Sequence, residues 1–352
     1  MTPLGYPIVV GQSIAAALRR FVRARDARFI VLADARVTPR ARLLTQGVKG
    51  REAVLSLALG ERRKRLTTVQ SVLAALLRAG ADRQTLVIGV GGGVASDLFG
   101  FAASIYMRGV PYAHVATSLL AMVDAAIGGK TGVDLAEGKN LAGSFSDPIA
   151  VFADVDALAT LPERNLRDGL AEMVKHAIIS GDDLFERLET LAPHAFGRWP
   201  WESIIADAIT VKAEIVALDP DEHGVRETLN LGHTFAHAIE RESGYRVSHG
   251  AAVGVGLRAA GLLALRTGRF SAEEHLRVLT LLALLKLPLS VDRSPAEIFT
   301  AMFADKKKKK GRLRFVLPRA LGDVEYGVQV PDAEVKAVLR LIVRPPGARE
   351  FR

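Results

Sequence analysis

The first half of the chain alternates short apolar runs with a helical pattern. From Val69 to Leu77, apolar residues recur at i, i+3, i+4, i+7 and i+8, and Gly80 follows where a helix C-terminus is expected. Strand–helix–strand alternation is typical of a parallel sheet covered by helices. Apolar runs predict four buried strands, at residues 29–33, 85–90, 112–116 and 150–153.

After about residue 163 the pattern changes to long stretches rich in Ala, Leu and Glu. A β pattern returns only near the end, where two short runs flank the turn-like pair Gly322-Asp323. We therefore predict an α/β class: an N-terminal parallel-sheet domain over residues 1–163 and a mainly α-helical domain over residues 164–352. The helical stretches are residues 166–189, 202–218, 230–242 and 251–265, and the late strands are residues 313–317 and 324–330.

Composition narrows the chemistry that the chain can perform. The 352 residues include no cysteine, which excludes disulfides, thiolate zinc ligands and a thiol nucleophile. A metal would therefore have to bind His, Asp or Glu. The chain carries 47 Lys and Arg against 38 Asp and Glu, a formal net charge of +9. This excess is compatible with nucleic acid, anionic lipid or a small anionic substrate.

A glycine-rich segment, Gly89-Val-Gly-Gly-Gly-Val-Ala-Ser-Asp97, directly follows a predicted strand and opens a predicted helix. Glycines there let the backbone approach a pyrophosphate, and a helix N-terminus supplies N–H donors. The spacing does not match G-x-G-x-x-G, and the acidic Asp34 lies upstream rather than about 20 residues downstream. Nucleotide binding and a structural glycine turn both fit this segment.

A second glycine segment runs from Asp124 through Gly128-Gly129-Lys130-Thr131 to Lys139-Asn140. A phosphate-binding G-x-x-x-x-G-K-[ST] loop needs glycine at position 124, where this chain has aspartate, so a P-loop NTPase is disfavoured. Two lysines and an amide among glycines still suit an anion. A solvated glycine loop is the alternative interpretation.

Histidines and a glutamate with metal-ligand spacing occur in the second half. His233 and His237 stand i, i+4 on one predicted helix, Glu172 and His176 stand i, i+4 on another, and His249 follows a predicted turn. Nitrogen and oxygen ligands that leave a coordination position open are typical of a catalytic divalent metal. Spacing alone favours His233 and His237 as the ligand pair.

Several cations stand in apolar surroundings. Lys175, Lys212 and Arg226 each fit a salt-bridged helix face when taken singly. Five consecutive lysines at residues 306–310 are typical of a solvated loop, and nucleic-acid binding is disfavoured because no aromatic residue is interleaved with them.

In order along the chain, these segments resemble the 3-dehydroquinate synthase family of the sugar phosphate cyclases. The resemblance covers nearly the whole chain, from Asp34 to the Lys306 region. Two departures are Ser118, where family members often have threonine, and Ala125, where they have serine. The strings that carry it are GVGGGVASDLFGFAASIYMRG, SLLAMVDAAIGGKTGVDLAEGKNLAG, DGLAEMVKHAI, VKAEIVALD and LNLGHTFAHAIE.

The resemblance implies a Rossmann-like N-terminal domain that binds NAD, a second domain that binds metal and substrate, and an active site in the cleft between them. It implies Zn²⁺ or Co²⁺ held by Glu172, His233 and His249, which replaces the pair favoured by spacing. The implied NAD contacts are Asp34, Glu61, Lys64, Gly92, Gly93, Val94, Asp97, Thr117, Ser118, Leu120, Lys139 and Thr160.

The resemblance also implies how the substrate is bound. Lys212 and Arg226 match the family's carboxylate contacts. Residues around the reacting hydroxyls correspond to Asp124, Lys130, Lys175 and Asn230. The family's phosphate contacts correspond to Arg108, Asn140, His237 and a lysine that is either Lys306 or Lys307.

The implied activity is that of a carbon–oxygen lyase of the shikimate pathway, which leads to chorismate and the aromatic amino acids. It converts 3-deoxy-D-arabino-heptulosonate 7-phosphate into 3-dehydroquinate and phosphate, through NAD-mediated oxidation, phosphate elimination, reduction and an intramolecular aldol closure. One alternative is another sugar phosphate cyclase of the 2-epi-5-epi-valiolone synthase type, although Lys212, Arg226, Asn230 and His237 keep the dehydroquinate-synthase residue types. Another is a metal-dependent glycerol or alcohol dehydrogenase, which would lack the substrate-binding cations and release NADH.

Partners and location follow as expectations. The expected substrate is a small anionic sugar phosphate, with neither nucleic acid nor a membrane as partner, and the family implies a homodimer. Residues 1–18 carry no charge, but Pro3, Gly5, Pro7 and Gly11 interrupt any apolar helix there, and no basic segment precedes them as a signal peptide would need. Elsewhere no charge-free run reaches the roughly 18 residues of a spanning helix. We therefore expect a cytoplasmic protein.

Overall fold

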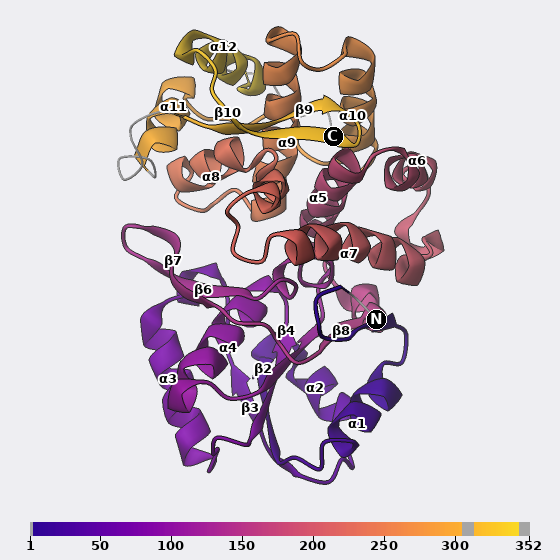
Figure 1. Ribbon diagram of the computed structural model, residues 1–352, viewed down its shortest axis with the longest axis vertical. Coiled ribbons are helices and arrows are strands. Elements are labelled where there is room, and N and C mark those ends of the chain that lie inside the picture. The colour runs from indigo at the N-terminus through magenta and orange to yellow at the C-terminus, as the bar shows by residue number, and fades with distance from the viewer. Residues whose placement is uncertain (1–2, 305–312, 345–352) are drawn as a thin grey trace. The chain divides into compact units, whose positions relative to one another are not determined.

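The computed structural model of the protein describes residues 3–304 and 313–344 (Figure 1). Contacts between Cα atoms group the chain into two compact units. The first unit comprises Met1–Leu166 and Trp201–Ala217, and the second comprises Arg167–Pro200 and Leu218–Arg352. The predicted boundary between residues 163 and 164 falls close to the first break, whereas the return of residues 201–217 to the first unit was not part of that prediction.

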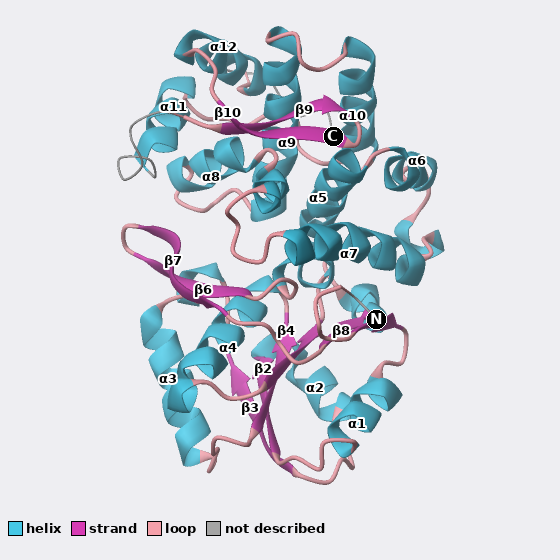
Figure 2. Ribbon diagram, viewed as in Figure 1, coloured by secondary structure: helices cyan, strands magenta, loops and turns pink. Residues whose placement is uncertain are grey.

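The first unit is built on a six-stranded parallel sheet with the order β1-β8-β5-β4-β2-β3. Figure 2 labels its strands β2, β3, β4 and β8. The four strands predicted from apolar runs correspond to β2, β4, β5 and β8, and the α/β class is confirmed. The edge strands β1 and β3 are only partly buried, which explains why they lack a continuous apolar run. The bounds are β1 Ile8–Gly11, β2 Phe29–Asp34, β3 Arg51–Leu57, β4 Leu86–Gly91, β5 Tyr112–Ala116 and β8 Val151–Asp154.

Helices cover both faces of this sheet because successive strand residues point to opposite sides. Ile30 and Leu32 of β2 pack with helices α3 and α4 on one face. Phe29, Val31 and Ala33 pack with α1 and α2 on the other. The helices of this unit are α1 Ala15–Arg23, α2 Thr38–Leu44, α3 Leu66–Arg78, α4 Gly93–Ile105 and α7 Trp201–Leu218, whose last residue belongs to the second unit.

A separate antiparallel hairpin, β6 Lys130–Leu135 and β7 Gly138–Phe145, carries the second glycine segment. Gly132 and Gly143 face each other across this hairpin, and a Cβ on Gly143 would lie 2.1 Å from the backbone carbonyl oxygen of Thr131. The glycines therefore allow close approach of the two strands, and Lys130 begins a strand rather than lying in a loop.

The second unit is mainly helical, as the sequence predicts, with a two-stranded antiparallel sheet. Helix α5 begins in the first unit and continues into the second at Arg167. The bounds are α5 Glu163–Ser180, α6 Asp182–Leu191, α8 His233–Glu242, α9 His249–Arg266, α10 Ala272–Leu284, α11 Pro295–Ala304, β9 Phe315–Ala320, β10 Asp323–Val328 and α12 Asp332–Ile342.

Two predicted helices are shorter than their apolar pattern. The stretch predicted as one helix over residues 166–189 is two helices, because Gly181 between them has φ +97°, which a right-handed helix cannot contain. A Cβ on Gly181 would lie 3.2 Å from Gly322 Cα in the β9–β10 turn, so tertiary contact selects glycine at this break. The stretch predicted from residue 230 becomes α-helical only at His233, because Gly232 has φ +76°.

Among the described residues, none of the helices combines the length and the low polarity that crossing a membrane requires.

Candidate functional site

The glycine segment of the first unit lies at the point where the order of the sheet reverses. The chain runs from β2 outward to β3 and then returns past β2 to β4, so β2 and β4 are neighbours with diverging connections. In parallel α/β sheets, ligands bind beyond the carboxyl ends of strands at such a switch point. Strand β4 ends at Gly91, Gly92 is the N-cap residue, and α4 begins at Gly93.

Side chains at these glycines would fill the space beside the helix N-terminus. A Cβ on Gly91 would lie 2.4 Å from the Ala95 Cβ, and one on Gly92 would lie 2.9 Å from the Ser118 hydroxyl. A Cβ on Gly93 would lie 3.3 Å from the Ala125 Cβ and 3.7 Å from Leu120 Cδ2. The structure thus brings together several residues expected to contact NAD, with Gly92 and Gly93 half-buried at the N-terminus of α4, the kind of position at which a dinucleotide phosphate binds.

Asp34 ends β2 beside this loop, and its side chain is buried. Its Oδ1 accepts hydrogen bonds from the Arg36 backbone N–H and from Nε, each at 3.0 Å, and the Arg36 guanidinium forms an ion pair with Oδ2. The acidic residue therefore lies next to the phosphate-type loop in space although it precedes the loop in sequence.

Four predicted NAD contacts form two ion pairs, which Asn140 extends into a small network. Lys64, which is buried, forms an ion pair with Asp97 of α4, and this carboxylate raises the pKa of Lys64 against the effect of burial. Lys139 Nζ lies 2.7 Å from Glu61 Oε1. Lys64 Nζ also donates to Asn140 Oδ1 at 2.6 Å.

Asp134 belongs to this network, although sequence reasoning did not single it out. Its carboxylate accepts the Asn140 backbone N–H at 2.9 Å, and its own N–H donates to the Lys64 carbonyl at 2.8 Å. Asn140 has φ +53°, an unusual conformation that this hydrogen bond stabilises. The segment Gly132-Val133-Asp134, which directly follows Lys130-Thr131, is the only sequence signal, and it becomes informative once the β6–β7 hairpin is known.

Asp124 and Lys212 form a pair within the first unit. Asp124 lies in a π-helical turn, Ala121–Ala125, and Lys212 lies on α7. Lys212 Nζ, which is buried, donates to Asp124 Oδ1 at 2.6 Å and to the Asp124 carbonyl at 2.7 Å. Two residues expected at the substrate are therefore held together, although they are far apart in sequence.

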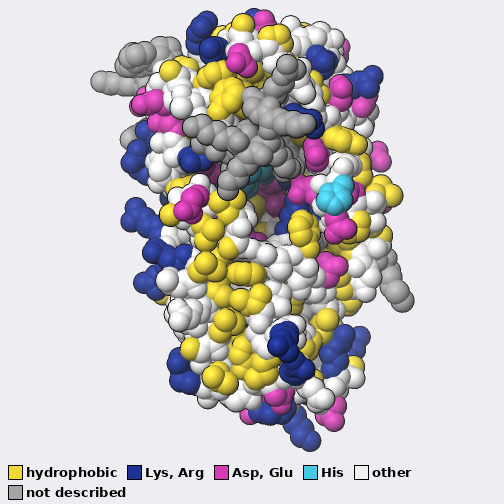
Figure 3. All heavy atoms as spheres, turned by 60° about the vertical axis from the view of Figure 1, so that its left-hand side comes forward, with side chains coloured by type: hydrophobic (Ala, Val, Ile, Leu, Met, Phe, Trp, Pro, Cys, Tyr) yellow, Lys and Arg dark blue, Asp and Glu magenta, His cyan; other side chains and the backbone are white. Residues whose placement is uncertain are grey.

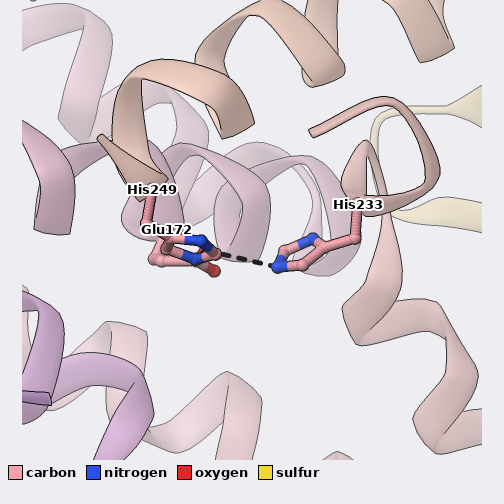
Figure 4. Close-up of side chains that lie close together, drawn as sticks. All are labelled: Glu172, His233 and His249. Carbon is pink, nitrogen blue, oxygen red and sulfur yellow. Dashed lines mark hydrogen bonds and ion pairs between the residues drawn. The ribbon is translucent and has the colours of Figure 1, made fainter. Parts of the chain in front are cut away.

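In the second unit, Glu172, His233 and His249 form a group whose ligand atoms all lie within 4.8 Å of one another (Figure 4). Glu172 Oε1 lies 3.0 Å from His249 Nε2 and 3.5 Å from His233 Nε2. One carboxylate and two imidazoles around one point are the donor set of a divalent metal with a coordination position left for another ligand. The residues present therefore fit such an ion.

Each candidate ligand residue lies either within a helix or at the beginning of one. Glu172 is on α5, and His233 and His249 are the first residues of α8 and α9. The Ser248 hydroxyl before α9 donates to Asp168 Oδ1 at 2.7 Å, and a Cβ on Gly250 would lie 2.1 Å from the Asp168 Cα. The beginning of α9 is therefore fixed against α5.

Burial and the neighbouring side chains together shift the pKa values of the three residues in this group. Burial opposes the charge of Glu172, but the Lys175 ammonium and the hydrogen bond from His249 hold the pKa of Glu172 well below the usual range. Burial lowers the pKa of His233 to about 3, so this imidazole is neutral and can donate a lone pair. Burial also opposes protonation of His249, but hydrogen bonds to Glu172 and Glu240 raise its pKa to about 10.

The fully buried Lys175 forms an ion pair with Glu172 on the same helix. The pair fits the i, i+3 spacing, which is one helical turn, and it places an ammonium directly beside the candidate metal ligands.

His237, the partner of His233 favoured by spacing, is outside this group. The rings of His233 and His237 are 5.3 Å apart between centroids and nearly perpendicular, whereas the group contains Glu172 and His249 from other helices. The pairing favoured by i, i+4 spacing is therefore not the one that the structure assembles.

Arg226 and Asn230 lie on the short helix Val225–Asn230 that precedes α8. The Arg226 guanidinium is buried and donates to the Pro220 carbonyl, and Asn230 Nδ2 donates to Glu222 Oε1 at 3.0 Å. Glu222 was not singled out from the sequence, where nothing distinguishes it from a surface acid.

The remaining predicted residues have less defined surroundings. Arg108 is exposed and has φ +71°, Lys130 is exposed at the start of β6, and the Thr160 hydroxyl donates to the Ala157 carbonyl at 3.2 Å. Thr117 is buried and its N–H donates to the Gly91 carbonyl at 2.9 Å. Lys306 and Lys307 lie outside the described residues.

Solved structures of sugar phosphate cyclases share this fold. The chain is similar to a 2-epi-5-epi-valiolone synthase from Streptomyces hygroscopicus subsp. jinggangensis with NAD⁺ and Zn²⁺ bound, at 30% identity and a TM-score of 0.87, with 96% of each chain covered. It is also similar to a 2-deoxy-scyllo-inosose synthase complexed with carbaglucose-6-phosphate, NAD⁺ and Co²⁺, at 25% identity and a TM-score of 0.85, covering 95% of this chain and 96% of that one.

Family models and curated relatives narrow the class. The model for the 3-dehydroquinate synthase N-terminal domain matches residues 54–168, and that for the C-terminal domain matches residues 169–308. A 3-dehydroquinate synthase of Xanthomonas oryzae pv. oryzae is 43% identical over 93% of this chain and 91% of its own length. The 3-dehydroquinate synthase of Symbiobacterium thermophilum is 39% identical over 95% of this chain and 96% of its own length. The chain belongs to the 3-dehydroquinate synthase family.

Proposed function

We propose that the protein converts 3-deoxy-D-arabino-heptulosonate 7-phosphate into 3-dehydroquinate and phosphate, as an NAD- and metal-dependent carbon–oxygen lyase of the shikimate pathway. The observation that carries the proposal is the group of Glu172, His233 and His249, with the buried Lys175 beside the buried Glu172, in a chain of this family. When bound, NAD⁺ supplies reversible oxidation of a substrate hydroxyl, and a divalent ion lowers the pKa of that hydroxyl.

The first unit supplies the proposed cofactor site. Backbone N–H groups at Gly92 and Gly93 bind the pyrophosphate at the α4 N-terminus. Asp34 stands at the adjacent strand end, where an acid accepts from ribose hydroxyls in such folds. The ion pairs Lys64–Asp97 and Lys139–Glu61 fix the loops that border the site.

The second unit supplies the proposed metal site. Glu172, His233 and His249 would hold Zn²⁺ or Co²⁺, both of which accept carboxylate and imidazole ligands. The Lys175 ammonium then offsets negative charge on substrate oxygens during the reaction, and its burial strengthens that interaction. The active site in the interdomain cleft stays a prediction.

Cationic and hydrogen-bonding side chains would recognise the substrate's two anionic groups. Lys212 and Arg226 are proposed to bind the carboxylate, and Asp124 holds Lys212 in place through its 2.6 Å hydrogen bond. Arg108, Asn140, His237 and one lysine of residues 306–307 are proposed to bind the phosphate. A dianionic phosphate explains this number of cationic and hydrogen-bonding groups.

A second candidate function is that of another sugar phosphate cyclase, because a 2-epi-5-epi-valiolone synthase is 30% identical to this chain. The full set Lys212, Arg226, Asn230 and His237 favours the dehydroquinate-synthase reaction. An alcohol dehydrogenase is disfavoured: a butanol dehydrogenase of Thermotoga maritima shares 16% identity, which indicates the fold alone.

The test is to incubate purified protein with the heptulosonate phosphate, NAD⁺ and Zn²⁺ or Co²⁺, and to follow phosphate and 3-dehydroquinate. We expect equal amounts of both products and no net NADH. Absence of phosphate release with cofactor and metal present would refute the proposal. Accumulation of NADH would indicate a dehydrogenase, and a different carbocycle would indicate another cyclase.

Variants test the assignment of residues. We expect Lys175→Ala and His249→Ala to abolish turnover without changing the far-ultraviolet circular dichroism spectrum. The matched control is Lys336→Ala, since Lys336 lies on α12 over the Phe299 ring. Activity close to wild type in both site variants would contradict the assignment.

We also propose a cytoplasmic homodimer, in keeping with the family. Apolar side chains gather on one face of the first unit in Figure 3, and an apolar surface of this kind is typical of an interface. Size-exclusion chromatography with light scattering tests the assembly, and a monomeric mass at micromolar concentration would contradict it. The large exposed apolar residues of this unit include Leu66, Leu77, Ile105, Met107, Leu141 and Phe145.

A further inference from the structure

Both ring nitrogens of His249 face a carboxylate. Nε2 lies 3.0 Å from Glu172 Oε1, within the candidate metal group, and Nδ1 lies 3.5 Å from Glu240 Oε1 on the other side of the ring. The three residues come from three helices, α5, α8 and α9. Glu240 was not among the residues singled out from the sequence.

A metal-binding imidazole needs an acceptor at the nitrogen that does not bind the metal. A hydrogen bond from Nδ1–H fixes the tautomer that leaves the lone pair on Nε2 and fixes the ring orientation. His233 has such an acceptor, because its Nδ1 lies 3.1 Å from the Leu231 carbonyl oxygen. For His249, the Glu240 carboxylate occupies the equivalent position. Both imidazoles thus direct Nε2 towards Glu172.

The position of Glu240 is fixed by its helix. Glu240 follows His233 by seven residues, which is two helical turns, so both side chains lie on the same face of α8. Its backbone carbonyl accepts from the Ser243 hydroxyl and from the Tyr245 N–H, each at 2.8 Å, at the end of this helix.

Burial makes this carboxylate informative. Glu240 is only 2% exposed, and a carboxylate is seldom buried to that degree unless it is paired, because its desolvation costs several kcal/mol. An apolar residue would fill the same volume without that cost. The charge is therefore explained by what it contacts, and the ring of His249 is the contact that leads to the metal group.

We propose that Glu240 is a positioning residue for the metal site: it accepts the Nδ1–H of His249 and thereby directs the Nε2 lone pair to the metal. The inference rests on the proposed metal site. The carboxylate also increases the electron density on the imidazole, which strengthens its bond to a divalent ion. Glu240 itself does not contact the substrate or the metal.

The experiment measures metal affinity in the absence of substrate. Metal-free wild-type protein, Glu240→Gln and Glu240→Ala are titrated with Co²⁺ in competition with a chromophoric chelator, and the visible absorption of bound Co²⁺ is recorded. We expect affinity to fall about 10-fold to 100-fold in Glu240→Ala and less in Glu240→Gln, whose amide oxygen still accepts a hydrogen bond. The Co²⁺ absorption should also change, because the orientation of one ligand changes.

Glu242→Gln is the matched control. Glu242 lies on the same helix, is also largely buried and forms an ion pair with Arg293 at 3.3 Å instead of contacting an imidazole. We expect its Co²⁺ affinity and absorption to equal those of the wild type. Circular dichroism verifies folding, and Glu240→Gln decides the question if Glu240→Ala does not fold, since it keeps the side-chain volume.

Glu172→Gln separates this inference from the proposed function. If Glu172→Gln weakens Co²⁺ binding while both Glu240 variants bind like the wild type, the role of Glu240 is overturned and the metal site stands. If Glu172→Gln also binds like the wild type, the proposed metal site itself is wrong. A lower melting temperature in Glu240→Gln with unchanged affinity would mean that Glu240 is only structural.

Discussion

Gly256→Ala should disturb the metal site from a distance, because it changes the packing of the two helices that carry the histidines. A Cβ at this position of α9 would lie 2.3 Å from the Gly232 carbonyl oxygen and 3.1 Å from its carbonyl carbon. Gly232 directly precedes His233, the first residue of α8. Ordinary contact begins at about 3.4 Å, so the two backbones must separate by about 1 Å.

The expected cost is dominated by this steric conflict. Forcing an extra methyl group into a packed interior costs about 1–3 kcal/mol, and the clash here involves backbone, which cannot rotate away. Alanine gains up to about 1 kcal/mol over glycine in a helix interior, so the free energy of unfolding should fall by about 0–3 kcal/mol. The shift also moves His233 away from Glu172 and His249, and we expect Co²⁺ affinity to fall at least 10-fold.

The assay combines thermal unfolding of the metal-free protein with Co²⁺ competition. Gly254→Ala, two residues earlier in the same helix, is the matched control, because its Cβ would lie 3.3 Å from Leu287 Cβ and the Pro288 oxygen, a contact that small shifts relieve. We expect this control to keep wild-type affinity. Unchanged affinity and melting temperature in Gly256→Ala would refute the reasoning.

Three further predictions concern charge. Burial lowers the pKa of His114 from 6.5 to about 4, so only the unfolded chain takes up this proton as the pH falls from 6.5 to 4, and the free energy of unfolding should fall by roughly 3 kcal/mol across that window. Urea unfolding at pH 7.5 and pH 5 should show that this free energy depends less on pH in His114→Gln than in the wild type. An equal pH dependence in the two proteins would contradict the assignment. Asp154→Ala should cost about 2–3 kcal/mol, because the fully buried Asp154 accepts hydrogen bonds of 2.6 and 2.7 Å from Arg40, which remains paired with Asp156. Asp156→Ala, which removes a more exposed partner of the same guanidinium, should cost about 1 kcal/mol. Similar losses of unfolding free energy in urea would argue against a role for burial. A chelator should stop turnover, and added Zn²⁺ or Co²⁺ should restore turnover in the wild type but not in Glu172→Gln. Turnover that persists in the presence of the chelator would contradict a metal-dependent reaction.

Local pattern was sufficient for the buried strands and the long helices. Strands β2, β4, β5 and β8 lie inside the sheet, so their sequences are continuously apolar and recognisable. The edge strands β1 and β3 and the β6–β7 hairpin escaped recognition, because partial burial and glycine give no such run. Helix α6 was merged with α5, since nothing in the periodicity reveals that Gly181 packs against Gly322.

For the candidate site too, local sequence determined some features and tertiary packing determined the others. The sequence by itself determined the residue types: a glycine segment after a strand, carboxylate and imidazole as the possible metal ligands in a chain without cysteine, and long strings that resemble one family. Helical spacing paired His233 with His237, because a single helix defines only contacts between residues three or four positions apart.

Only the tertiary structure decided which of these side chains meet. It joins Glu172, His233 and His249 from three helices, and Lys212 to Asp124 across 88 positions of sequence. It also adds Glu240, whose carboxylate is unremarkable in the sequence and becomes informative through its burial beside His249. Local sequence fixes the face of a helix on which a side chain lies, but the packing of helices against one another determines what that face contacts.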